Sequence, residues 1–116
     1  MRILSLEEFR KMPEGTVFMK YEPCVFEDLQ VKGETWETDF IAANITYWPD
    51  CTGSGDFSDK LFAAQDSGES ILLDFDCYGR DGCFEKGQLF AVYEKRDIKM
   101  LIDKLNRCLA ISTTLK

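Results

Sequence analysis

The chain has 116 residues, of which 45% are apolar and 13% aromatic, and its formal net charge is −7 with no histidine. This composition is too apolar for a disordered chain and predicts one α+β domain spanning residues 1–116. Without histidine, Ser-His-Asp and Cys-His nucleophile pairs are excluded. The first ten residues do not resemble a secretory signal, and no apolar run approaches the roughly 18 residues of a membrane span. We therefore expect a non-enzymatic cytoplasmic protein that uses no cofactor and does not bind membranes.

A capping motif marks the first element. Ser5 and Glu8 have the S-x-x-E spacing in which each side chain hydrogen-bonds the other residue's backbone amide. This motif predicts a short helix over residues 6–12. Pro13 ends it, because the residue before a proline avoids the helical conformation.

Five segments have the composition of β-strands. Clear alternation of apolar and polar residues marks 70–77, and a continuous apolar run at 88–93 indicates a central strand. The remaining strands are predicted at 16–21, 29–32 and 35–48, although residues 40–44 also fit a helix. The glycine-containing stretches 50–55 and 78–87 are predicted as loops, the second of them joining two strands as a hairpin.

Two further helices complete the expected fold. Residues 56–65 have apolar side chains at helical spacing, with Asp56 available as the cap. The last helix is an amphipathic one, with Ile98, Leu101, Ile102, Leu105 and Leu109 on one face. The predicted architecture is α+β, with a mostly antiparallel sheet of four or five strands, a short N-terminal helix and a C-terminal amphipathic helix.

Charge is distributed unevenly along the chain. Residues 22–85 contain fifteen acids and three bases, whereas residues 86–116 contain seven bases and three acids. An acidic folded surface repels the phosphate backbone, so direct nucleic-acid binding is not expected. The same field attracts a basic protein surface, which is the predicted partner. The simpler alternative is that the acids only maintain solubility.

The segment 74–85 partly matches a calcium-binding loop. It has acids at the first, third and eighth positions, glycine at the sixth and glutamate at the twelfth. Tyr78 stands where a carboxylate or amide ligand is required, and the flanks are predicted strands. We therefore predict no metal site and interpret Asp74 and Asp76 as solvated residues on one strand face. The five cysteines are expected to be reduced and mostly buried, and no catalytic residue is assigned.

Binding residues are predicted around the aromatic side chains of the acidic region. Tyr, Trp and Arg are enriched at binding hot spots, and acids near them suit a basic partner. The predicted set is Tyr47, Trp48, Asp50, Asp56, Asp59, Tyr78, Arg80 and Asp81. Packing in the core or at its rim is the competing interpretation for Trp36 and Trp48.

The stretch from Leu6 to Lys32, LEEFRKMPEGTVFMKYEPCVFEDLQVK, resembles the opening of small uncharacterised proteins encoded by bacteriophages and prophages. It covers about a quarter of the chain and includes no known active-site residue. The resemblance implies an accessory gene product, and such proteins often block host defence systems.

Three functional hypotheses follow from the sequence. The first is an acidic protein that inhibits a host defence or nucleic-acid-binding protein by docking on its basic surface. The second is a protein that binds a small molecule such as a nucleotide, for which Lys60, Arg80 and the basic last helix would have to converge. The third is a carboxylate and metal-dependent enzyme centred on Asp74, Asp76 and Asp81. The oligomeric state is left open.

Overall fold

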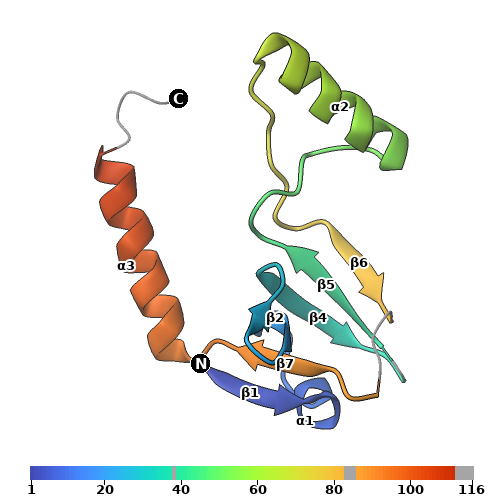
Figure 1. The fold of residues 1–116 in the computed structure, drawn as a ribbon, viewed down its shortest axis with the longest axis vertical. Helices are drawn as coiled ribbons and strands as arrows, with labels where there is room; N and C mark the ends of the chain where they lie inside the picture. Colours follow the sequence, from blue (N-terminus) through green and yellow to red (C-terminus); the bar gives the residue numbers. More distant parts are fainter. Residues whose placement is uncertain (38, 83–85, 112–116) are drawn as a thin grey trace.

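The fold is a seven-stranded antiparallel sheet with three helices, seen in a computed structural model that describes residues 1–37, 39–82 and 86–111 (Figure 1). The strands are β1 (Arg2–Ser5), β2 (Val17–Glu22), β3 (Val25–Phe26), β4 (Gln30–Thr35), β5 (Phe40–Asn44), β6 (Tyr78–Asp81) and β7 (Leu89–Val92). The helices are α1 (Leu6–Arg10), α2 (Ser54–Ser67) and α3 (Lys95–Ile111). The α+β class, the antiparallel sheet and the helices near both ends of the chain are confirmed. The sheet has more strands than the four or five predicted, because β1, β3 and β6 were not anticipated.

The strand order is β1-β7-β2-β4-β5-β6, with β3 paired to β2. β7 is therefore an interior strand, as its continuous apolar sequence predicted. It pairs with β1 from the start of the chain and with β2, so that Leu89 lies opposite both Ser5 and Tyr21. Strand β7, from the last third of the chain, thus lies between two strands from its first quarter.

The predicted capping box at the start of α1 is confirmed. The Glu8 amide donates to Ser5 Oγ at 3.2 Å, and the Ser5 amide donates to Glu8 Oε1 at 3.0 Å. The helix thereby places Phe9 on the sheet, where its ring stacks on Phe90 with the centroids 4.2 Å apart.

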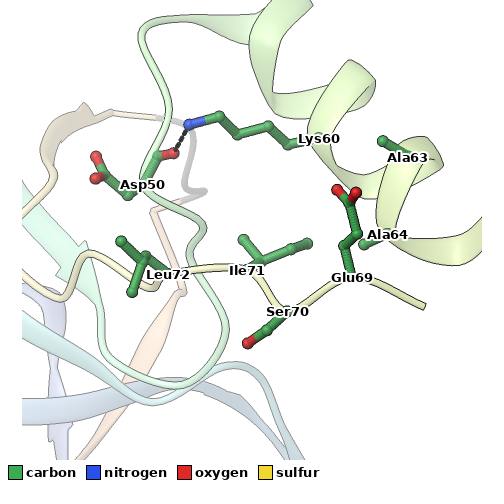
Figure 2. A pocket seen from close by; sticks show the side chains of 8 residues that line it. All are labelled: Asp50, Lys60, Ala63, Ala64, Glu69, Ser70, Ile71 and Leu72. Carbon is green, nitrogen blue, oxygen red and sulfur yellow. Dashed lines mark hydrogen bonds between the residues drawn. The ribbon is translucent and has the colours of Figure 1, made fainter. Parts of the chain in front are cut away.

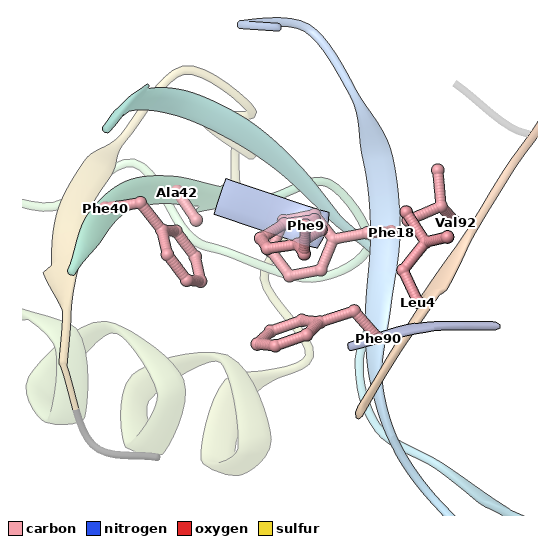
Figure 3. Packing of buried hydrophobic residues seen from close by; sticks show 7 residues of the cluster. All are labelled: Leu4, Phe9, Phe18, Phe40, Ala42, Phe90 and Val92. Carbon is pink, nitrogen blue, oxygen red and sulfur yellow. The ribbon is translucent and has the colours of Figure 1, made fainter. Parts of the chain in front are cut away.

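The hydrophobic core forms where Phe9 meets the sheet. Its buried cluster consists of Leu4, Phe9, Phe18, Phe40, Ala42, Phe90 and Val92 (Figure 3). The four phenylalanine rings come from α1, β2, β5 and β7, and all pairs among them lie within 6.1 Å between centroids. Packing of these rings joins one helix to three strands.

The predictions for 70–77 and 78–87 were wrong. Residues 70–77 form no strand, and only Leu73 makes an isolated bridge, to Pro49. Strand β6 instead occupies Tyr78–Asp81, inside the segment that was predicted as a hairpin loop. Alternation makes a strand only when a neighbouring strand supplies hydrogen bonds, and β5 supplies them to residues 78–81.

The predicted long strand over 35–48 was also wrong in extent. Thr35 ends β4, and the Trp36 amide donates to the Asp39 carbonyl at 2.7 Å. Strand β5 covers only Phe40–Asn44, so the helical alternative for these residues is excluded.

The two long helices lie outside the core. α2 is confirmed but starts at Ser54, and Asp56 is not its cap: Gly53 holds that position, and the Asp56 carboxylate accepts from the Thr52 amide at 2.9 Å. α3 is confirmed over Lys95–Ile111, and neither helix has a buried residue. Figure 1 shows α3 extending away from the sheet. Of the helices in the described part of the chain, none is long and apolar enough to span a membrane.

The expectation that the cysteines are mostly buried was wrong for the four that can be described. Cys24, Cys77 and Cys108 are exposed and Cys51 is half-buried, all as free thiols. Cys83 lies outside the described residues.

Candidate binding site

A cavity of about 290 Å³ lies beside the last residues of β5, next to β6 and the start of β4. The side chains that matter for its chemistry belong to Asp28, Asn44, Tyr47, Trp48 and Asp81. The cavity therefore combines carboxylates with aromatic rings.

A turn after β5 orients the aromatic residues. Asn44 Oδ1 accepts hydrogen bonds from the Thr46 amide at 2.8 Å and from the Tyr47 amide at 3.2 Å. This side chain takes the place of a backbone acceptor and stops the strand. Tyr47 then donates its hydroxyl to Asp28 Oδ2 at 2.8 Å, and this hydrogen bond raises the pKa of Tyr47. The phenol stays neutral, and the bond fixes Asp28 at the cavity wall.

Trp48 occupies the position between this cavity and the start of α2. Its ring packs on Phe57 with the centroids 5.0 Å apart, and an adjoining apolar hollow of about 310 Å³ is lined by both rings. The indole Nε1 is buried and has no hydrogen-bond partner among the described residues. Trp48 is half-buried and belongs to neither the core cluster nor the open surface.

Asp81 contributes a second, partly neutralised carboxylate. It pairs with Lys20 Nζ at 2.8 Å, and both side chains are largely shielded from solvent. Lys20 lies opposite Phe90 in the sheet, so this ion pair is on the core face. Among the described residues no cation forms an ion pair with Asp28, and the described lining of the cavity therefore has an excess of negative charge.

Arg80 and Tyr78 face the other way. Side chains alternate along a strand, so both project from the face opposite Asp81. The Arg80 guanidinium lies 4.9 Å from the Trp36 ring centroid, and its Nε donates to Asp39. Arg80 is among the residues that line the cavity, because β6 passes beside it. Its guanidinium group, however, forms an ion pair with Asp39 on the opposite face of the sheet.

The remaining predicted residues, Asp50, Asp56 and Asp59, lie away from this cavity. Asp50 borders a separate cavity of about 230 Å³ between α2 and the segment that follows it (Figure 2). Lys60 reaches from α2 to donate to the Asp50 carbonyl and also lies 3.6 Å from Asp56. The eight predicted residues are therefore distributed over three places, and only Tyr47, Trp48 and Asp81 direct side chains to the first cavity.

The carboxylates named in the metal-dependent alternative do not assemble a metal centre in the part of the chain that the structure describes. No three His, Cys, Asp or Glu side chains gather there in a way that could hold an ion. Asp74 accepts from the Asp76 amide at 2.9 Å, forming a local turn, and Asp81 pairs with Lys20. The last residues of the calcium-like segment, 83–85, lie outside the description.

Sequence reasoning missed Asp28, Asn44 and the buried Lys32. Asn44 ends an apolar run and precedes a turn, a position typical of asparagine, so a local signal existed. Asp28 has no such signal, because only the pairing of β4 with β5 brings it to Tyr47.

Lys32 is the least expected side chain in the sheet. It is 1% exposed and hydrogen-bonds the Gly33 carbonyl and Thr35 Oγ1, with Nζ 6.0 Å from the Phe9 ring centroid. Burial lowers the pKa of its ammonium group.

Comparison with protein-family models, curated proteins and solved structures finds no match for this chain.

Proposed function

We propose that this protein is a non-enzymatic binding protein. It binds a basic protein surface through the cavity formed by Asp28, Tyr47, Trp48 and Asp81. The observation that carries the proposal is the Asp28 carboxylate, which Tyr47 fixes beside the Trp48 ring and which forms no ion pair among the described residues. The surrounding chain strengthens the attraction, because residues 22–85 contain fifteen acids against three bases.

The chemistry of the cavity suits an arginine or lysine side chain of the partner. A guanidinium can hydrogen-bond a carboxylate and stack on an indole face at the same time. Proteins that bind nucleic acid expose such cations, and occupation of those cations by this protein would inhibit them. That activity is consistent with a phage accessory role directed against a host defence protein.

A nucleotide ligand has less support. Its phosphates require convergent cations. Lys60 contacts Asp50 and Asp56, and Arg80 contacts Asp39, on different parts of the molecule. The basic last helix, α3, extends away from the sheet (Figure 1).

The proposal is tested by titrating the protein with a peptide of eight arginines and following both indole N–H signals by NMR. We expect the Trp48 indole signal to shift and the Trp36 signal to stay, since only Trp48 borders the cavity. Asp28→Asn should weaken binding by about tenfold, which corresponds to loss of one charge-assisted hydrogen bond.

Asp103→Asn on α3 is the matched control, because it removes the same charge from an exposed site. A peptide of eight glutamates should not bind. Equal weakening by the two asparagine variants would show that the peptide responds only to net charge, and the cavity would then have no specific role.

A further inference from the structure

The described fold leaves much more surface exposed than a monomer of its size requires. Its accessible surface is 8451 Å², whereas folded monomers of 13.4 kDa expose about 6,500 Å². Its radius of gyration is 16.2 Å, compared with about 13 Å for a compact chain of this length. The excess area is roughly 2,000 Å², and a standard interface buries about 800 Å² per partner.

Part of the excess is the apolar face of α3. Leu105 is 57% exposed and Leu109 is 72% exposed, and the helical repeat places them on one face with Ile98 and Ile102. The same repeat places Lys95 and Lys99 along one border of this face and Lys104 along the other. The α3 face is thus an apolar stripe with basic borders.

The base of α3 has a defined orientation. The Glu94 amide donates to Asp97 Oδ2 at 2.8 Å, which caps the first turn. This cap fixes the residue at which α3 begins, and therefore which side chains form the apolar stripe.

A surface of opposite character lies on residues 50–76, which we call the acidic arm. It contains seven acids and one base, Lys60, which already contacts Asp50 and Asp56. Phe62 is 62% exposed on α2 between Asp59 and Asp66, and Leu72 is 77% exposed in the segment after the helix. The other large exposed apolar side chains of the acidic arm are Leu61, Leu73 and Phe75.

We infer that α3 of one molecule docks on the acidic arm of a second copy of this chain, and that the reciprocal contact closes a two-fold dimer. The charges are complementary, whereas two α3 helices placed together would bring like charges into contact. The lengths also match, since α3 extends about 25 Å and α2 about 21 Å. A two-fold dimer contains the contact twice, so each molecule has both its apolar surfaces covered.

The inference is tested by sedimentation velocity of the full chain over a range of concentrations. The wild type should sediment as a dimer, and Leu105→Glu should dissociate it with at least a tenfold rise in the dissociation constant. Met100→Glu is the matched control, because Met100 is 64% exposed on the opposite face of α3. The far-UV circular dichroism should be unchanged in both variants, since α3 contains no buried residue.

Charge reversal identifies the surface that α3 contacts. Lys99→Glu with Lys104→Glu should dissociate the dimer, and so should Asp59→Lys with Asp66→Lys. Mixing these two double variants should restore a dimer, since each contact then again joins opposite charges.

A monomeric wild type at 100 μM would overturn the inference. A dimer that survives the change of Asp59 and Asp66 to lysine would also overturn it, and would indicate pairing of α3 with α3. Failure of the arginine-peptide experiment would leave this result unaffected, because Leu105 is not part of the binding cavity.

Discussion

At the residue scale, Lys32 places an ammonium group against the aromatic core, where it hydrogen-bonds the Gly33 carbonyl and Thr35 Oγ1. We expect Lys32→Met to raise the free energy of unfolding at pH 7 by about 1 kcal/mol, because a thioether chain of similar length needs no hydration. Urea unfolding measures this difference.

The pH dependence of that gain follows from the lowered pKa of Lys32. Above the folded-state pKa the native lysine has lost its proton, while the unfolded lysine holds one up to about pH 10.5. The wild type should therefore gain stability relative to Lys32→Met as the pH rises through this window. A constant difference between pH 7 and pH 10.5 would show that Lys32 does not titrate differently on folding.

Cys24 holds a backbone conformation that favours glycine. Its φ is 66°, in the turn between β2 and β3, and its amide donates to the Tyr21 hydroxyl at 2.9 Å. Cys24→Gly should raise the free energy of unfolding by about 0.5 kcal/mol, because removal of the side-chain clash exceeds the entropic cost of glycine. Thermal unfolding should show no such gain for Cys24→Ala, which keeps a Cβ atom.

At the element scale, α1 depends on its capping box to hold Phe9 over the sheet. Ser5→Ala should lower the free energy of unfolding by about 1 kcal/mol, since the Glu8 amide loses its acceptor. Ser58→Ala, on the exposed face of α2, is the control and should change little.

The same capping box makes a contribution to the free energy of unfolding that depends on pH. The Ser5 amide lowers the pKa of Glu8, so its stabilising effect is present above the unfolded-state pKa and is lost as the pH falls through the folded-state value. The difference between wild type and Glu8→Gln should therefore shrink in acid. Denaturant melts at pH 7 and pH 3 measure it.

Elements with local signals were predictable from the sequence. The capping motif of Ser5 and Glu8 predicts a helix without knowledge of the rest of the chain. The helical spacing of apolar residues from Ile98 to Leu109 does the same. β1 and β6 were missed because short strands of four residues form only when β7 and β5 provide partners. Residues 70–77 show the converse, since their alternation finds only one bridging partner, Pro49.

At the scale of the whole molecule, stability should be concentrated in the sheet. Hydrogen exchange of the dilute Leu105→Glu variant should be slowest in β2 and β7, next to the buried phenylalanines, and much faster in α2 and α3. Mass spectrometry of the exchanged protein measures the contrast. Comparable protection of α3 and β7 would show that the helix packs on its own chain.

The candidate site was predictable only in part at this scale. Tyr47 and Trp48 stand out as aromatic residues in an acidic region, and both line the cavity. Arg80 and Asp81 are neighbours in sequence but point to opposite faces, and their assignment required the pairing of β5 with β6. Charge and residue type thus suggested a site, while its shape depended on the sheet.

The position of β7 between β1 and β2 has a consequence for synthesis on the ribosome. Phe9, Phe18 and Phe40 emerge early, but the ring that completes their packing, Phe90, emerges only after three quarters of the chain has been made. Until then the nascent chain has exposed aromatic residues and no partner for β1. We therefore expect the core to form only late in translation, after β7 has emerged from the ribosome.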